Sequence, residues 1–358
     1  MVRLKDICDV DWGDTNLTKQ AYVENGKYLG VSAGGCDGRM DYYDFEAYTP
    51  VISAIGANCG KMFLPEEPFV AIKNTITLKP HKDILGKYIF YALNSNKIPH
   101  RGGGQPFISK TDTEEYMIIC PSLEEQTRIV TIFDKVCKTI DMRHKQLSKL
   151  DELVKSRFVE LFRAEEYPNT TLIELIIEDA GLSYGIVVPG DNVEEGVPMI
   201  RPSDFKNDNL CLNNVYRVSP EIEAKYAKTR LIGDEILVQV IGQPGQIMLS
   251  DIRCKGMNVT RNLAVVRPDC NKINRIYLKT YMQTPEAQAF MLGETKQSTL
   301  KQLPLGRLKE LEVPVPPIEL QNQFATFVEQ TDKSKFEIQK SLEKLETLKK
   351  ALMQKYFV

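Results

Sequence analysis

Two long stretches of the chain carry apolar residues at alternating spacings of four and three, the pattern of a coiled-coil seam. Each stretch follows a proline, which suits the first turn of a helix because proline lacks only an N–H that would be unpaired there. We therefore predict helices over residues 121–162 and 316–358, each more than three times the mean helix length. The seam positions of the first are Ile129, Phe133, Val136, Ile140, Arg143, Leu147, Leu150, Val154, Arg157 and Leu161. Those of the second are Phe324, Val328, Thr331, Lys335, Ile338, Leu342, Leu345, Lys349, Leu352 and Tyr356.

Charged residues interrupt the two seams at different places. Arg143 of the first aligns with Ile338 of the second, whereas Lys335 of the second aligns with Ile140 of the first. Two helices that share one seam would cover each other's gaps. The residues predicted to pair are Val136, Ile140, Leu147, Leu150, Val154, Ile338, Leu342, Leu345 and Leu352. The alternative is two unrelated surface helices, each packed on its own domain.

The two halves of the chain also repeat each other. A shift of 195 residues places residues 121–162 on 316–357 without a gap, so that Gln126 falls on Gln321 and Phe162 on Phe357. The preceding segments match more loosely, VISAIGANCGKMFL with LVQVIGQPGQIML and KNTITLKP with RNLAVVRP. In both halves an apolar strand, a glycine turn, a strand and a short helix precede the proline-rich exit and the long helix. We predict a tandem duplication of an α+β domain with a helical arm, divided into residues 1–120, 121–162, 163–315 and 316–358.

Composition narrows the class of protein. The chain has 358 residues with 46 Lys and Arg against 48 Asp and Glu, which excludes binding to nucleic acid by bulk charge alone. A hydrophobic content of 42% is ordinary for globular domains and excludes an acidic disordered tail. No stretch approaches the roughly 18 apolar residues of a membrane span, and the first residues lack the apolar core of a signal peptide. We expect a cytoplasmic protein with no membrane partner.

The sequence offers little support for catalysis. None of the eight cysteines forms a C-x-x-C pair or stands at zinc-ligand spacing, so we expect reduced and mostly buried thiols. The three histidines share no local motif with Ser, Cys or Asp. No Walker-type phosphate loop and no Asn-Pro-Pro-Tyr-like methyltransferase tetrad is present. The nearest nuclease-like element, Glu223-Ala224-Lys225, is interpreted as a helix surface with ordinary charges.

Polar loops precede both proline exits, at residues 100–106 (HRGGGQP) and 294–301 (ETKQSTLK). Arg and Lys suit guanine edges, Gln and Asn suit adenine edges, and the N–H groups of a glycine run can approach a phosphate. A surface turn without a ligand is the alternative for the glycine run. The loop IRPSDFKNDN supplies two further cations and has its own alternative, a β-turn with an Asx cap.

These phrases in their duplicated order resemble the specificity subunits of type I restriction-modification enzymes. The second half carries GDEILVQVIGQPGQIML, NVTRNLAVVRP, INRIYLKTYMQT, VPVPPIELQNQFATFV and KLETLKKALMQKYF. The first half carries ISAIGANCGKMF, NTITL and PSLEEQTRI in the same roles, although it begins closer to its first strands and is shorter. The likeness covers essentially the whole chain.

The resemblance implies a fold of two tandem target recognition domains of mixed α/β build, each followed by a long helix, with the helices pairing as an antiparallel coiled coil. Each domain would read one part of a split sequence in double-stranded DNA. The helices would set the distance between the domains and dock two methyltransferase subunits, to which restriction subunits are added. The chain itself would be non-catalytic and hold no metal or cofactor, while the assembled complex would use S-adenosylmethionine, ATP and Mg.

From loop position and residue type we expect DNA contacts from nine residues. They are Lys61, Arg101, Gln105, Arg201, Lys206, Gln243, Lys296, Gln297 and Lys301. Two functions from other classes remain open at this point: a coiled-coil protein–protein adaptor with no DNA binding, and an enzyme with an unrecognised site in the glycine-rich loop.

Overall fold

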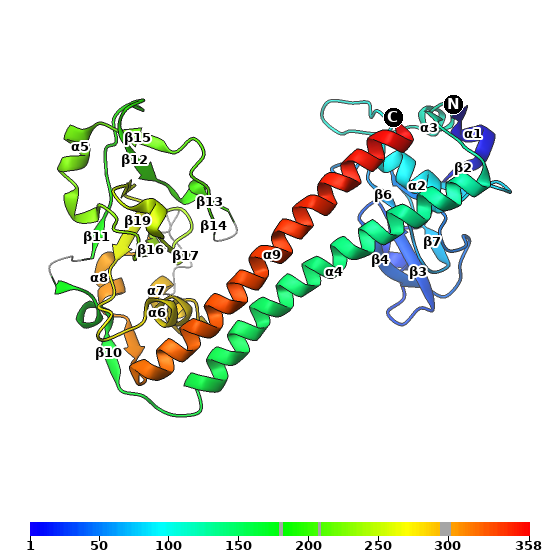
Figure 1. Cartoon of the computed structure of the whole chain (residues 1–358). Helices are drawn as coiled ribbons and strands as arrows, with labels where there is room; N and C mark the ends of the chain where they lie inside the picture. Colours follow the sequence, from blue (N-terminus) through cyan, green and yellow to red (C-terminus); the bar gives the residue numbers. More distant parts are fainter. Residues whose placement is uncertain (179–181, 207–208, 294–301) are drawn as a thin grey trace. The chain divides into compact units, whose positions relative to one another are not determined.

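The computed structural model describes residues 1–178, 182–206, 209–293 and 302–358 (Figure 1). The chain divides into two compact units. Unit 1 comprises Met1–Leu147 and Glu337–Val358, and unit 2 comprises Ser148–Phe336. Each unit therefore contains part of both long helices.

Unit 1 begins with a mixed α/β domain. Its strands are β1 (Val2–Arg3), β2 (Cys8–Trp12), β3 (Tyr28–Ser32), β4 (Gly35–Met40), β5 (Val51–Ser53), β6 (Met62–Phe63), β7 (Phe69–Ala71), β8 (Thr75–Pro80) and β9 (Met117–Ile118). Its short helices are α1 (Leu4–Ile7), α2 (Gly86–Ser95) and α3 (Lys110–Glu114). The first long helix, α4 (Leu123–Phe162), follows directly and continues into unit 2.

Unit 2 repeats this build. Its strands are β10 (Asn169–Thr171), β11 (Ser183–Tyr184), β12 (Val197–Ile200), β13 (Phe205–Lys206), β14 (Asn209–Leu210), β15 (Tyr216–Val218), β16 (Ile236–Gln239), β17 (Ile247–Leu249), β18 (Asn258–Val259), β19 (Leu263–Val266) and β20 (Glu312–Pro314). Its short helices are α5 (Pro220–Ala224), α6 (Arg275–Met282), α7 (Pro285–Leu292) and α8 (Leu305–Lys309). The second long helix, α9 (Ile318–Phe357), begins here and ends in unit 1.

The strand orders of the two units correspond sheet by sheet. The order β2-β8-β5-β6 in unit 1 matches β11-β19-β16-β17 in unit 2. A second sheet, β4-β3-β7, matches β15-β12-β18, and in both its central strand has one antiparallel and one parallel neighbour. The pair β1-β9 matches β10-β20. The duplication predicted from sequence is therefore present in the strand topology, with a mixed α/β build in each half.

Buried polar groups tie each long helix to the domain before it in the same way. The buried Gln126 side chain accepts a hydrogen bond from Leu85 N at 3.0 Å and donates to Pro121 O at 3.0 Å. Its counterpart Gln321 accepts from Asn274 N at 2.8 Å and donates to Pro316 O at 2.8 Å. Both amides satisfy a backbone N–H at the start of a short helix, where no helical partner exists.

The far end of each long helix packs into the core of the other repeat. In unit 1 the ring of Phe357, at the end of α9, lies 5.5 Å from that of Tyr88 on α2. In unit 2 the ring of Phe162, at the end of α4, lies 4.7 Å from that of Tyr277 on α6. In both units the beginning of one helix therefore lies with the end of the other (Figure 1). This antiparallel arrangement confirms the predicted fold class, and the alternative of two helices packed only on their own domains is wrong.

Side chains at the positions predicted to pair along the two helices are shielded from solvent. The nine positions predicted to pair are all buried or half-buried, with Leu342 the least exposed at 3%. The charged interruptions Arg143 and Lys335 are half-buried as well, and Lys335 Nζ lies 2.7 Å from Asp151 of α4 within unit 2. Which side chain faces which along the seam stays a prediction.

Candidate nucleic-acid interface

Equivalent glycine turns follow the central strand of the larger sheet in both units. After β5 the backbone turns at Gly56 and Gly60, with φ values of 87° and 81°. After β16 it turns at Gly242 and Gly245, with φ values of 91° and 89°. Positive φ is readily available only to glycine, which explains the glycines that the two halves share. The two turns begin and end at matching glycines of positive φ, although the turn of unit 1 is one residue longer, and their side chains differ.

In unit 1 the loop of residues 100–106 returns beside this turn. Gly56 N donates to Pro106 O at 2.9 Å, and Arg101 and Phe107 exchange two backbone hydrogen bonds across the loop. Gln105 is exposed near the tip. The guanidinium of Arg101 is 67% exposed and forms an ion pair with Asp112, a carboxylate whose pKa is lowered first by the Ser109 hydroxyl and further by Arg101. The loop thus presents a cation and an amide to solvent.

Lys61 lies at the end of the same turn. Its backbone O accepts from Ser53 N at 2.9 Å, which holds the start of β6 against β5. Its ammonium group lies 5.5 Å from the centre of the Phe63 ring, and the residue is exposed. The structure therefore brings Lys61, Arg101 and Gln105 to one region of unit 1. Lys61 directly follows the glycine turn, and the loop of residues 100–106 is hydrogen-bonded to that turn.

In unit 2 the glycine turn borders a pocket of about 450 Å³. Arg201, Gln239, Gly242, Arg261 and Asn262 line it. Gln243 is exposed immediately after Gly242. Gln239 is buried, and its amide donates to Ile241 O at 2.9 Å, so its own conformation is fixed at the base of the turn.

The remaining candidates of unit 2 are placed only in part. Lys206 lies on β13. Lys296, Gln297 and Lys301 lie outside the residues that the structure describes. Gln302, the next described residue, forms a bridge with Ile241, just as Phe107 does with Ile55 in unit 1. The contacts of all nine candidates with DNA stay a prediction.

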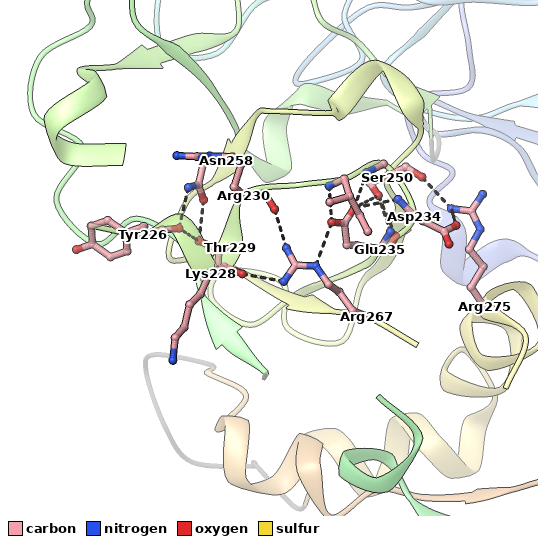
Figure 2. Close-up of polar contacts among 12 residues, drawn as sticks. Tyr226, Lys228, Thr229, Arg230, Asp234, Glu235, Ser250, Asn258, Arg267 and Arg275 are labelled. Atoms are coloured by element: carbon pink, nitrogen blue, oxygen red, sulfur yellow. Dashed lines mark hydrogen bonds and ion pairs between the residues drawn. The ribbon is translucent and has the colours of Figure 1, made fainter. Parts of the chain in front are cut away.

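A buried ion pair joins strands β16 and β19 of unit 2, at the opposite end of these strands from the residues that line the pocket (Figure 2). Glu235, fully buried just before β16, accepts from Ile232 N at 2.7 Å, Gly233 N at 2.9 Å and the Ser250 hydroxyl at 2.7 Å. Arg267, just after β19, lies 3.3 Å from the Glu235 carboxylate. Burial raises the pKa of Glu235, but these donors outweigh it and hold the pKa below its ordinary value.

Two more buried polar residues of unit 2, Glu223 and Asn258, form a second hydrogen-bonded network. Glu223 is 3% exposed and forms an ion pair with Arg230, and Asn258 of β18 donates to it at 3.1 Å. The interpretation of Glu223-Ala224-Lys225 as an ordinary charged helix surface is therefore wrong for Glu223. Hydrogen bonds from Asn258 to Tyr226 O and from Thr229 to Asn258 extend this network (Figure 2). These residues hold β18 against α5 and the segment that follows it.

Comparison with known proteins agrees with this duplicated architecture. The sequence profile of the family described as "Type I restriction modification DNA specificity domain" matches residues 1–152 and 190–350. The chain belongs to this family. It is 24% identical over 337 residues to the type I restriction enzyme EcoBI specificity subunit of Escherichia coli, an alignment that covers 81% of this chain and 69% of that subunit.

Solved structures show the same fold. A type I restriction-modification S subunit from M. genitalium matches with a TM-score of 0.66 and 19% identity, covering 100% of this chain and 95% of that one. A chain from a structure that addresses complex assembly of a type I restriction-modification system matches with a TM-score of 0.57 and 16% identity, covering 99% and 96%. The chain is a type I restriction-modification specificity subunit with two tandem recognition domains.

Sequence reasoning missed several residues that shape the site of this specificity subunit. Tyr216 contacts Arg201 only because β12 and β15 pair, which the sequence does not show. Asp204 stands three residues after Arg201, but its burial, which fixes the arginine, had no signal in the sequence. Arg261 and Asn262 were visible only as the counterparts of Lys73 and Asn74. The folded structure of unit 2 places both residues in the lining of the pocket.

Proposed function

We propose that this specificity subunit reads a DNA target in two separate parts, one with each recognition domain. The observation that supports this most directly is the pair of equivalent sheets whose turns carry different side chains. Unit 1 presents Lys61, Arg101 and Gln105, whereas unit 2 presents Arg201 and Gln243 around its pocket. Two domains with one backbone plan and different polar side chains are suited to read two different base sequences.

The near-neutral charge of the chain fits recognition of a DNA sequence better than non-specific electrostatic binding to DNA. A formal net charge of −2 gives weak non-specific attraction to phosphates, so most of the affinity for DNA must come from elsewhere. We infer that partner subunits complete the positively charged surface around the duplex. This chain then supplies discrimination between sequences.

The paired helices are the proposed docking surface for two methyltransferase subunits, to which restriction subunits are added. The internal duplication supports this, since it presents equivalent helical surfaces twice. The similarity to a chain from a structure of type I complex assembly also supports it. The alternative of an adaptor without DNA binding gains no support from the matched family.

Catalysis is assigned to those partners. We propose that S-adenosylmethionine, ATP and Mg bind to the methyltransferase and restriction subunits and that this chain is non-catalytic. Within the described ranges no group of three or more His, Cys, Asp or Glu side chains is placed to hold a metal ion. Nor does any helix in those ranges have the length and apolarity to cross a membrane. A cytoplasmic location is part of the same proposal.

Co-purification and methyl transfer test this function together. The tagged chain is expressed with type I methyltransferase subunits of its own organism, and methylation of mixed DNA is measured with and without the chain. We expect a stable complex and methylation only when the chain is present. A chain that captures no methyltransferase, or that turns over substrate alone, would contradict the proposal.

A further inference from the structure

Arg201 is held in a fixed orientation by a buried carboxylate. Its Nε donates to Asp204 Oδ2 at 3.3 Å and its Nη2 donates to Asp204 Oδ1 at 2.9 Å. The side chain of Asp204 is 8% exposed, and its Oδ2 also accepts from Arg201 N at 2.8 Å. Two side-chain bonds to one carboxylate fix the plane of the guanidinium, which a single bond would leave free to rotate.

An aromatic ring supports the same guanidinium. The Cζ atom of Arg201 lies 5.7 Å from the centre of the Tyr216 ring on β15, a cation–π distance. The hydroxyl of Tyr216 donates to Gly190 O at 2.6 Å, which fixes the ring in turn. Arg201 is therefore ordered before any ligand arrives, and ordering it on binding costs little further side-chain entropy.

One edge of this guanidinium remains available. An arginine has five N–H donors, and Asp204 takes one from Nε and one from Nη2. Among the described residues, Nη1 has no hydrogen-bond partner, so Nη1 and the second hydrogen of Nη2 form a pair of parallel donors. The Arg201 side chain is 37% exposed and lines the pocket beside Gly242 and Asn262.

Paired parallel donors match the O6 and N7 acceptors of guanine, which is the commonest specific contact of arginine in the major groove. We propose that Arg201 reads a guanine in the part of the DNA target recognised by unit 2. This inference rests on the proposed function and assigns a base to one of its residues. Asp204 and Tyr216 act as positioning residues.

The other repeat lacks this reader. The parallel pairing of β12 with β18 and of β3 with β7 places Ile200 opposite Val259 and Val31 opposite Ala71. Asn262 of unit 2 matches Asn74 of unit 1, so Val259 and Ala71, each three residues earlier, match as well. Their partners Ile200 and Val31 are therefore equivalent, and the counterpart of Arg201 is Ser32. The Ser32 hydroxyl donates to Asp37 at 2.8 Å, and that carboxylate also binds Lys19. A lysine is a point charge without the bidentate fork, so the same readout is not available at the equivalent position of unit 1.

To test this, the methylated sequence motif is determined in cells that express the methyltransferase together with the wild-type chain, with Arg201→Ala or with Arg201→Lys. The three motifs are then compared. We expect both variants to lose the requirement for the same single guanine, with discrimination falling about 5- to 100-fold, and to leave the other part of the motif unchanged. Lysine keeps the charge but loses the fork, so its failure to rescue identifies base reading.

A matched control is Arg253→Ala. Arg253 also binds one carboxylate, that of Asp251, through both its Nε and its Nη2, but it does not line the pocket. We expect this variant to keep the wild-type motif, and thermal unfolding of all purified variants confirms that each is folded.

The outcomes separate the inference from the function it rests on. A wild-type motif with Arg201→Lys, together with an even loss of methylation with Arg201→Ala, identifies a phosphate contact and overturns the guanine assignment. An unchanged motif in both variants overturns it as well. If the wild-type chain itself directs no motif, the proposed function fails.

Discussion

Arg101 and Arg201, one in each recognition domain, are both paired with an aspartate. The two pairs differ in how far the aspartate is buried. Asp204, beside Arg201, is 8% exposed, whereas Asp112, beside Arg101, is 18% exposed on a short helix at the surface. The Arg101 guanidinium itself is 67% exposed, against 37% for Arg201. Arg201 is consequently a fixed reader, while Arg101 can leave its partner and adapt to DNA.

Arg101→Ala is expected to weaken modification at only one part of the DNA target, because the side chain belongs to unit 1 alone. The loss of one contact of this kind costs about 1–3 kcal/mol of discrimination or affinity. Methylation rates on oligonucleotides altered in one part at a time measure this. Lys97→Ala, an exposed change on a neighbouring segment, is the control. Equal loss on unrelated sequences would argue against base or phosphate contact within the recognised part.

Individual residues show where prediction from sequence stops. Loop position and residue type suffice to nominate Arg101 and Arg201, because cations and amides at turns are the residues that DNA edges require. The same approach treats Glu223 as a surface charge. Its burial depends on the ion pair with Arg230, which forms only in the folded chain. Glu235 is missed for this reason too, because its partner Arg267 follows another strand, β19, and is 32 residues away in the sequence.

Glu235 makes the stability of unit 2 sensitive to acid. Its pKa is lower in the folded state than in the unfolded state, so its contribution is fully present above the unfolded value, near pH 4.3. That contribution is lost as the pH falls through the folded value. Glu235→Gln is therefore expected to destabilise unit 2 most at neutral pH, with the difference from wild type shrinking below about pH 4.

Urea unfolding at a series of pH values measures this dependence. Glu194→Gln, a change at an exposed carboxylate of the same unit, should leave the pH profile of the unfolding free energy unaltered. A difference between wild type and Glu235→Gln that stays constant with pH would contradict the role of the ionised carboxylate.

At the scale of elements, each long helix serves two domains. It begins at a proline exit fixed by a buried glutamine and ends with a phenylalanine in the core of the other repeat. The heptad pattern and the 195-residue repeat predict the helices and the duplication well, because both are properties of local sequence. They do not predict where the helix ends pack, since that depends on contacts between residues far apart in the chain.

Phe162→Ala and Phe357→Ala test these end contacts. Each is expected to lower the free energy of unfolding by about 3–5 kcal/mol, the cost of removing a buried phenylalanine ring. Hydrogen–deuterium exchange locates the effect. Phe162→Ala should raise exchange in α6 and β16 of unit 2, and Phe357→Ala in α2 and β8 of unit 1. Val159→Ala, at a side chain 49% exposed, should change stability by less than about 0.5 kcal/mol.

The opposite pattern of hydrogen–deuterium exchange would contradict the packing of each helix end in the core of the other repeat. If Phe162→Ala raised exchange in β5 and β8, the end of α4 would belong to the domain that precedes it in the sequence.

At the scale of the whole molecule, a matched pair of helices is expected to set the spacing of the two recognised sequences. Deleting residues 143–149 together with 338–344 removes seven residues from each helix and keeps the heptad register. At about 1.5 Å per residue this shortens each helix by roughly 10 Å, the length of about three base pairs. The gap between the two parts of the methylated motif should shrink by about that number, as measured by sequencing of methylated DNA.

Shortening only α4 is the control for this experiment. It takes the two seams out of register, so we expect loss of the paired helices and of methylation rather than a new gap. A matched deletion that leaves the preferred gap unchanged would reject the helices as a ruler.

We propose that this chain alone decides which DNA sequence is modified. Methylation sequencing of the genome in cells with and without the chain, all other subunits being present, tests it most directly. We predict a methylated motif of two defined parts separated by unspecified bases, which disappears when the chain is removed and returns when it is supplied again. A motif that persists without the chain, or a methylated sequence without two separate parts, would contradict the account.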